Sequence, residues 1–321
     1  MDKRTLRIIF MGTPEFAVGT LERLVNENFN VVAVLTQPDK PVGRHQDTLQ
    51  PPAVKVFAEE HGIPVLQPVK MKDEAFVAEL RSYEADIFVV VAFRMLPEVV
   101  WAMPRFGTFN VHAALLPQYR GAAPINWAII NGETQTGVTT FFLDHDIDTG
   151  RIIMKKPFDI ADDYNVEDVY DGLMALGADI AVETLEKVIA TDGNLETIAQ
   201  EEAVSEEVLA NLKPAPKIFR ETCEINWQQS CKAVYDFIRG LSPIPGAWTN
   251  FTKGGKPTVM KIYKASKTEK SSVGYEPGDV LVDNKQLLFA TTDYFLSVDV
   301  LQVQGKKRTE AKDFLNGLRL N

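Results

Sequence analysis

The sequence predicts an α/β protein with a doubly wound, mainly parallel sheet, followed by a smaller β-rich domain. In the first two-thirds of the 321 residues, short β-rich runs alternate with stretches whose apolar residues recur at helical spacing. Such alternation needs crossover connections, which place helices on both faces of a parallel sheet. Beyond residue 213 the runs become short and strand-like, a spacing typical of a small OB-like β-barrel.

The elements of the first part follow from these patterns. The expected strands are Arg7–Met11, Asn30–Leu35, Ile87–Val91 and Phe109–His112, with a later pair at Gly137–Leu143 and Ile152–Phe158. The expected helices are Phe16–Asn26, Ala53–His61, Asp73–Tyr83, a segment near Ile125–Asn131, and a long helix from Asn165 to about Ala190. Asn165 is a suitable cap for this long helix, because its side chain can accept a hydrogen bond from a free backbone N–H.

The second part begins after a stiff, proline-containing hinge at Lys213–Lys217. The expected elements are a helix at Ser230–Gly240 and strands at Thr258–Tyr263, Gly278–Val282, Gln286–Ala290 and Phe295–Gln302. We therefore expect two domains, residues 1–207 and 208–321.

The charge is unevenly distributed along the chain. The net charge is -10, yet residues 211–321 hold 17 Lys and Arg against 11 Asp and Glu, whereas the first 210 residues hold 17 against 33. A basic C-terminal part indicates contact with a polyanion, although an ordinary solvated basic surface fits the asymmetry equally well. The most compact basic groups are Lys261, Lys264 and Lys267, and Lys306, Lys307 and Arg308.

Several classes of protein are disfavoured by what the sequence lacks. Cys223 and Cys231 are too few for a disulfide framework and form no CxxC pair, which indicates a reducing compartment. The apolar run Leu6–Met11 is too short for a signal peptide or a membrane span, so we expect a cytoplasmic protein. The first strand is followed by Gly12-Thr13-Pro14, without the glycine pattern of a dinucleotide site, and no P-loop, GxSxG or HExxH motif occurs.

Polar side chains gather where a parallel sheet places its chemistry, at the carboxyl end of a strand. Asn110 and His112 alternate along the expected strand and so lie on one side of it. An amide and an imidazole together can stabilise a developing oxyanion and move protons, although an Asn-x-His pair is more often structural. The run Leu143–Gly150 carries three alternating aspartates, of which one is expected to reach His112.

A calcium loop is a weaker interpretation of this aspartate run. Counting from Asp144, the glycine and carboxylate positions of an EF-hand are occupied by Thr149 and Lys155, so we expect no metal. The small-residue loop from Ala114 to Pro124 would let a ligand approach the backbone closely. In the long polar segment 37–52, Arg44 is a candidate for binding a phosphate or a carboxylate.

Taken together, these motifs resemble the folate-dependent formyltransferase family. The matching stretches, in family order over nearly the whole chain, are Met11–Ala17, Leu35–Asp39, Asn110–Ala113, Leu115–Pro117, Arg120–Pro124 and Leu143–Gly150. The resemblance implies a Rossmann-like catalytic domain and a catalytic trio of Asn110, His112 and Asp148. It also implies that the co-substrate is 10-formyltetrahydrofolate, with no metal, and that its site is lined by Ala114, Leu115, Leu116 and Pro117.

The resemblance further implies the acceptor. A formyl group would pass to the amino group of methionine on an initiator tRNA, the segment with Arg44 would contact the acceptor end, and the basic C-terminal domain would contact the tRNA body. No membrane and no obligate protein partner are expected. Formyl transfer to a sugar-nucleotide amine, hydrolysis of formyltetrahydrofolate, and a non-catalytic RNA-binding role are the alternatives. The basic C-terminal domain favours tRNA, and an intact trio disfavours a non-catalytic protein.

Overall fold

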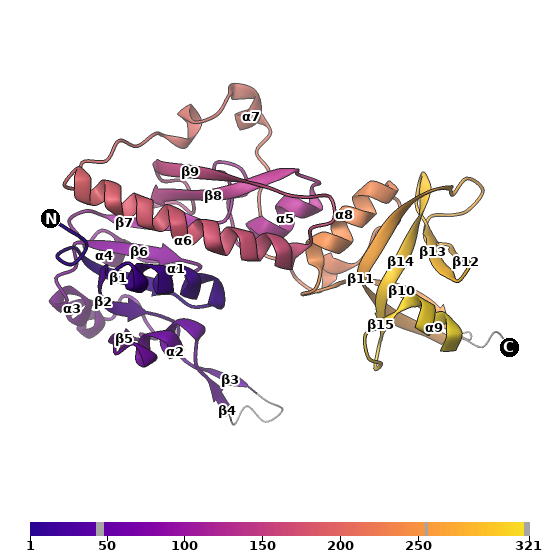
Figure 1. Cartoon of the computed structure of the whole chain (residues 1–321), viewed down its shortest axis with the longest axis horizontal. Helices are drawn as coiled ribbons and strands as arrows, with labels where there is room; N and C mark the ends of the chain where they lie inside the picture. The colour runs from indigo at the N-terminus through magenta and orange to yellow at the C-terminus, as the bar shows by residue number, and fades with distance from the viewer. Residues whose placement is uncertain (43–47, 254–255, 318–321) are drawn as a thin grey trace. The chain divides into compact units, whose positions relative to one another are not determined.

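The computed structural model describes residues 1–42, 48–253 and 256–317 (Figure 1). The chain forms two compact units. The sheet unit comprises Met1–Gly121, Thr136–Phe158 and Tyr170–Pro214, and the C-terminal unit comprises Ala122–Gln135, Asp159–Val169 and Ala215–Asn321. The chain therefore enters the C-terminal unit three times, while the expected single boundary at 207/208 stays a prediction. Among the described residues, no helix is both long and apolar enough to cross a membrane.

The sheet unit is built on seven strands in the order β5-β2-β1-β6-β7-β8-β9. They are β1 (Arg7–Gly12), β2 (Asn30–Leu35), β5 (Val65–Leu66), β6 (Ile87–Val91), β7 (Thr108–His112), β8 (Gln135–Phe142) and β9 (Ile152–Asp159). The pairs from β5 to β7 are parallel, and β8 joins β7 in the antiparallel sense. The mainly parallel sheet is confirmed, with β2 and β6 at their predicted bounds. A separate hairpin pairs β3 (Lys40–Val42) with β4 (Thr48–Gln50).

Helices cover both faces of this sheet. They are α1 (Glu15–Asn26), α2 (Ala53–Glu60), α3 (Glu74–Ser82), α4 (Glu98–Trp101) and α6 (Val166–Ala190). The connection after α6 holds a 3-10 turn η1 (Gln200–Glu202) and the short helix α7 (Glu206–Ala210), which has no buried residue. Phe76 of α3 and Val100 of α4 pack with Met11 of β1 in one core cluster. Asn165 caps α6 as expected, because its Oδ1 accepts the N–H groups of residues 167 and 168.

Helix α6 packs on one face of β7 and β8. The hydroxyl groups of Thr140 on β8 and Thr184 on α6 lie 2.9 Å apart. A Cβ added at Gly177 of α6 would lie 3.4 Å from the side chain of Val111 on β7. Because side chains alternate along a strand, Asn110 and His112 point to the opposite face of the sheet.

The C-terminal unit is an antiparallel sheet with three helices. Its elements are α5 (Pro124–Ile130), η2 (Glu221–Cys223), α8 (Cys231–Leu241), β10 (Ala247–Lys253), β11 (Lys256–Ser271), β12 (Val280–Asp283), β13 (Gln286–Ala290), β14 (Tyr294–Val303), β15 (Thr309–Glu310) and α9 (Ala311–Gly317). The strand order is β10-β11-β14-β13-β12, and β15 pairs with β14. The rings of Trp227 and Phe289 stack with centroids 4.6 Å apart in its core. The predicted β-rich C-terminal domain is thereby confirmed.

A buried ion pair holds helix α8 within this unit. Asp236 and Arg239 are 3% and 7% exposed, and the Arg239 Nε donates to Asp236 Oδ1 over 2.8 Å. The same guanidinium donates to the carbonyl oxygen of Tyr164, also over 2.8 Å, while Lys232 binds the second carboxylate oxygen from a half-exposed position. Charges this deeply buried are tolerated because each has partners of opposite charge or polarity.

Candidate active site

Strand β7 ends with the two side chains that the sequence singles out. His112 is only 6% exposed, and Asn110 is half-buried two residues before it. The Asn110 Oδ1 atom is buried and has no hydrogen-bond partner among the described residues. Buried polar atoms in folded proteins are normally paired, so this oxygen is an acceptor that a ligand can use.

The His112 ring is held by the backbone of the loop that follows it. Its Nε2 lies 2.9 Å from the carbonyl oxygen of Tyr119. A carbonyl oxygen can only accept, so Nε2 carries the proton and Nδ1 is the atom that gains or loses one. Nδ1 faces the Asp148 Oδ2 atom at 3.9 Å, which is too long for a direct hydrogen bond. The carbonyl oxygen of Tyr119 therefore fixes the tautomer.

Of the three aspartates in the 144–148 loop, only Asp148 reaches the imidazole. Its carboxylate is mostly buried, and Oδ2 accepts the backbone N–H of Gly121 over 3.0 Å. Asp144 is exposed and instead accepts the hydroxyl of Thr149 over 2.7 Å within its own loop. The structure thus brings His112 and Asp148 together, while their catalytic roles stay predictions.

The predicted folate-lining segment presents its backbone more than its side chains. Ala114 and Leu116 are fully buried, Pro117 is buried, and Leu115 is half-buried. The Thr139 hydroxyl donates to the carbonyl oxygen of Ala114 over 2.6 Å and accepts the N–H of Leu116 over 3.1 Å. A ligand at this segment would therefore contact backbone atoms and Leu115, not the side chains of Ala114 and Leu116.

Two cationic side chains lie against loops of the sheet unit without a carboxylate partner among the described residues. The Lys155 Nζ donates to the carbonyl oxygen of Leu116 over 2.7 Å, and burial lowers the pKa of this amine. The Arg94 guanidinium, in the loop after β6, donates to the carbonyl oxygens of Pro68 and Val69, and burial lowers its pKa too. Uncompensated positive charge in such loops favours a ligand that carries an anionic group.

The predicted polyanion-binding residues are not equivalent in the structure. Lys264, Lys306 and Lys307 are exposed, whereas Lys261 is half-buried and donates to the carbonyl oxygen of Pro245. Lys267 is already neutralised by an ion pair of 2.7 Å with Asp162.

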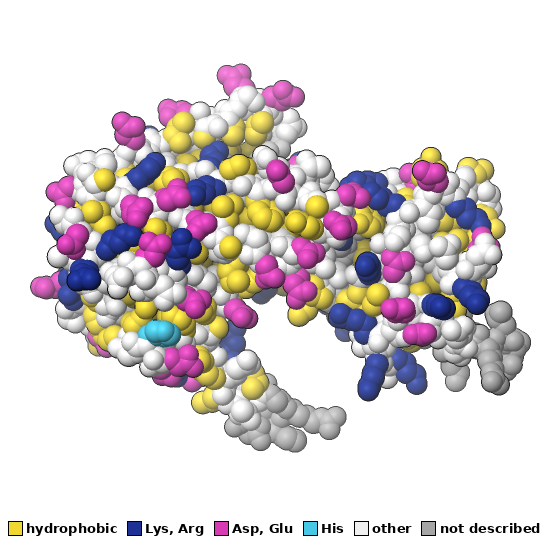
Figure 2. Space-filling view, viewed as in Figure 1, with side chains coloured by type: hydrophobic (Ala, Val, Ile, Leu, Met, Phe, Trp, Pro, Cys, Tyr) yellow, Lys and Arg dark blue, Asp and Glu magenta, His cyan; other side chains and the backbone are white. Residues whose placement is uncertain are grey.

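Arg308 differs from the lysines because its guanidinium stacks over the Tyr263 ring at 3.6 Å from the centroid. Figure 2 shows Lys and Arg side chains over the sheet of the C-terminal unit, interspersed with acidic ones. Arg44 lies outside the described residues.

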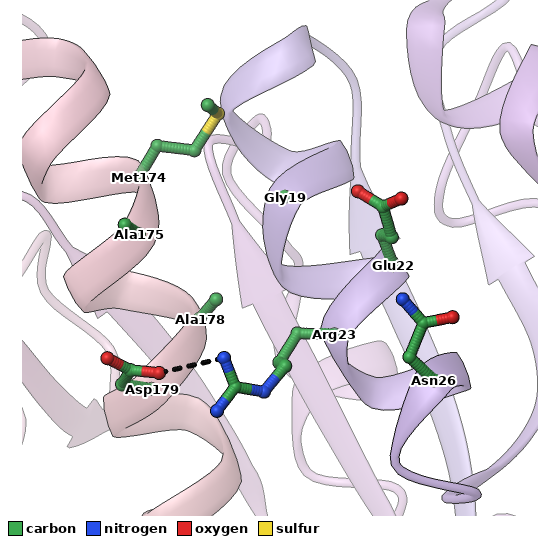
Figure 3. A pocket seen from close by; sticks show the side chains of 8 residues that line it. All are labelled: Gly19, Glu22, Arg23, Asn26, Met174, Ala175, Ala178 and Asp179. Atoms are coloured by element: carbon green, nitrogen blue, oxygen red, sulfur yellow. Dashed lines mark ion pairs between the residues drawn. The ribbon is translucent and has the colours of Figure 1, made fainter.

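A surface hollow of about 300 Å³ lies apart from these strand-end residues. It lies between helices that run side by side, and Figure 3 shows Glu22 and Arg23 of α1 and Met174 and Asp179 of α6 along it. The guanidinium of Arg23 forms an ion pair of 3.0 Å with Asp179 across it. None of the predicted site residues line this hollow. Within the described ranges, no group of three or more His, Cys, Asp and Glu side chains is arranged to hold a metal ion.

Sequence comparison decides the family. A model described as formyl transferase matches residues 6–185, and one described as formyl transferase, C-terminal domain, matches residues 217–319. The chain belongs to the formyltransferase family. Methionyl-tRNA formyltransferase of Parabacteroides distasonis is 55% identical to this formyltransferase over 321 residues, covering 99% of this chain and 98% of that protein. The enzyme of the same name from Bacteroides fragilis is 52% identical over 322 residues, covering 100% and 97%.

Solved structures of low sequence identity share the fold. The sugar 3N-formyl transferase WlaRD, solved in the presence of dTDP and 5-N-formyl-THF, is 19% identical with a TM-score of 0.65, over 94% of this chain and 99% of that one. HypX from Aquifex aeolicus, in complex with tetrahydrofolic acid, is 18% identical with a TM-score of 0.62. That match covers 96% of this formyltransferase but only 46% of HypX, so this chain spans about half of HypX.

Several residues around the site of this formyltransferase were not predicted from the sequence. Tyr119 and Gly121 act through backbone atoms, which any residue type could supply. Thr139 and Lys155 fix the 114–117 segment from strands β8 and β9. Gln200 comes from the polar connection after α6 and binds the Asp148 loop. Of these residues, Lys155 alone could have been noticed in the sequence, because it is a lysine within a strand whose neighbouring strand is buried.

Proposed function

We propose that this formyltransferase transfers the formyl group of 10-formyltetrahydrofolate to the amino group of methionine on the initiator tRNA. The proposal is supported by relatives that carry this reaction in their names and match the chain from end to end. The observation in the site that carries it is the proximity of Asp148 to His112, which lies two residues after Asn110 on β7. Such a chain works in the cytoplasm, where initiator tRNA is charged and used.

The bound donor supplies a formyl carbon that the amine attacks, and negative charge then develops on the formyl oxygen. The Nδ2 group of Asn110 can donate to this oxygen, whereas its Oδ1 atom, which has no partner among the described residues, can only accept. When Nδ1 takes up the proton of the amine, the His112 ring adds positive charge beside the formyl oxygen. Removing one such donor from an oxyanion site typically raises the barrier by about 2.7–4 kcal/mol.

The reaction moves one proton from the attacking amine to the leaving N10 atom of the folate, while the new C–N bond forms and the formyl carbon–N10 bond breaks. Free α-amino groups titrate near about 7.7–8.0, so the amine is partly deprotonated before it binds. His112 Nδ1 is the exchangeable position, because Nε2 is committed to Tyr119. Nδ1 lies 3.9 Å from Asp148, so a reacting nitrogen or a water molecule placed beside both groups could pass the proton between them.

The contacts with the two substrates are part of the same proposal. The folate would lie along the backbone of residues 114–117 and against Leu115, near the Lys155 ammonium. The tRNA body would lie on the exposed cations of the C-terminal unit, chiefly Lys264, Lys306 and Arg308. Lys267 would contribute less, since Asp162 neutralises it. Arg44 would contact the acceptor end.

The test compares acceptors for the same formyl donor. The full-length protein and 10-formyltetrahydrofolate are incubated with charged initiator tRNA, with uncharged initiator tRNA, or with a sugar-nucleotide amine. Rapid transfer to the charged tRNA alone supports the proposal. Faster transfer to the sugar amine, or release of formate at the same rate without any acceptor, refutes it.

A further inference from the structure

The connection between α6 and α7 is bound tightly to the loop that carries Asp148. Ile198 exchanges two backbone hydrogen bonds with Ile152, of 2.8 and 3.0 Å. Next to it, the Arg151 guanidinium donates to both the hydroxyl and the carbonyl oxygen of Thr197. These contacts place Gln200 beside the 148–150 backbone. All of these residues belong to the sheet unit.

The Gln200 side chain is 1% exposed, and its amide is fully hydrogen-bonded. Its Nε2 donates to the carbonyl oxygens of Asp148 and Gly150, over 2.8 and 2.9 Å. Its Oε1 accepts from two guanidinium nitrogens of Arg120, over 3.0 and 2.6 Å. Two carbonyl acceptors and one cationic donor can be satisfied together only by an amide in this orientation.

These bonds link the two backbone segments that aim the Asp148 carboxylate. Asp148 has a left-handed backbone with φ +55°, a conformation that is uncommon for non-glycine residues, although aspartate adopts it more readily than most. Its carboxylate is oriented by the N–H of Gly121, and Gly121 directly follows Arg120. Gln200 therefore holds the backbone of the Asp148 loop through its N–H groups and, through Arg120, the chain segment that leads to Gly121.

We propose that Gln200 is a positioning residue for the formyl-transfer reaction, acting through Asp148. This inference rests on the proposed role of Asp148 in the transfer. Gln200 touches no substrate; it keeps the Asp148 carboxylate facing the Nδ1 atom of His112. Loss of its two N–H donors lets the Asp148 backbone relax from its left-handed conformation, which moves the carboxylate away from the imidazole.

Gln200→Glu separates this role from general packing. A glutamate has the same shape and still accepts from Arg120, now as an ion pair. It has no N–H groups, and its negative charge faces the carbonyl oxygens of Asp148 and Gly150. The substitution therefore removes the bonds to the Asp148 loop and leaves the bond to Arg120 in place. Arg151→Ala is the matched control, because it loosens the same connection at Thr197 and leaves the Gln200 bonds intact.

The experiment is a double-mutant cycle in the full-length protein, with kcat and both KM values measured for the wild type, Gln200→Glu, Asp148→Asn and the double variant. We expect Gln200→Glu to lower kcat about tenfold or more, because two hydrogen bonds to the Asp148 loop are lost. Both KM values should stay within about threefold of the wild-type values. In the Asp148→Asn background the same substitution should cause almost no further loss, because interacting residues are not additive. Arg151→Ala should keep kcat within about twofold of the wild type.

Hydrogen exchange of the backbone amides of residues 146–150 provides a readout independent of turnover. Exchange should be faster in Gln200→Glu and unchanged in Arg151→Ala. Equal losses of kcat from Gln200→Glu in both backgrounds, or unchanged exchange, overturn the positioning role. If Asp148→Asn turns over like the wild type, the proposed role of Asp148 fails, and the role of Gln200 in the reaction fails with it. If the wild type transfers no formyl group, the proposed function fails. Faster exchange in Gln200→Glu would still show that Gln200 holds the Asp148 loop.

Discussion

Replacing Asp148 with asparagine tests the electrostatic part of the site at constant shape. An asparagine can still accept the N–H of Gly121, so the loop keeps its anchor while the charge opposite His112 is lost. Two unit charges 3.9 Å apart, at an effective dielectric constant of about 20, interact by about 4 kcal/mol. If the transition state contains a protonated His112, turnover falls by up to about a thousandfold.

The assay is steady-state formyl transfer to charged initiator tRNA, with thermal unfolding measured in parallel. Asp146→Asn is the control, because this exposed carboxylate on the same loop forms no ion pair with His112. We expect a large loss of kcat for Asp148→Asn, little change for Asp146→Asn, and similar melting temperatures for both. Near-normal turnover of a folded Asp148→Asn protein would refute the view that this carboxylate stabilises the protonated imidazole.

Three further predictions concern the C-terminal unit. Lys264→Ala should weaken tRNA binding and lower the dependence of log affinity on log salt concentration by roughly one. Lys267→Ala should have a smaller effect, because Asp162 already neutralises Lys267, and equal effects in binding titrations over salt concentration would contradict this. Asp236→Ala should destabilise the unit by about 3–5 kcal/mol, since it leaves a buried arginine without its carboxylate. Lys232→Ala should destabilise it by no more than about 1 kcal/mol, and similar losses of unfolding free energy in denaturant for the two variants would contradict this. Burial raises the pKa of both cysteine thiols, so alkylation at pH 8 should be slow until the protein unfolds, and rapid labelling of the native protein would show that a thiol is accessible.

The periodic elements were the part of the fold that the sequence could predict. A strand such as Ile87–Val91, apolar throughout, has few alternatives to a buried central position, and the structure places it there. β10 was missed because Ala247–Lys253 follows a proline-rich turn and alternates weakly between polar and apolar residues. Short edge elements such as β5 and β15 have only two residues and too little pattern to predict.

The site was predictable where it depended on local alternation and not where it depended on loops meeting in space. Asn110 and His112 share a face because they are two residues apart on a strand. The choice of Asp148 over its two neighbours depended on the resemblance, since all three aspartates carry the same charge at the same spacing. Gln200 lies 52 residues from Asp148 in the sequence, and an isolated buried glutamine has no periodic signature that would link the two.

In the proposed reaction, the formyl group ends on the amino nitrogen of methionine carried by the initiator tRNA. The most direct measurement follows a label in the formyl carbon of 10-formyltetrahydrofolate through a single turnover, then hydrolyses the ester bond of the tRNA and identifies the labelled product. We expect N-formylmethionine in amounts equal to the tetrahydrofolate released, with almost none from a folded His112→Ala protein. Label recovered as formate, or product formation that His112→Ala leaves unchanged, would contradict it.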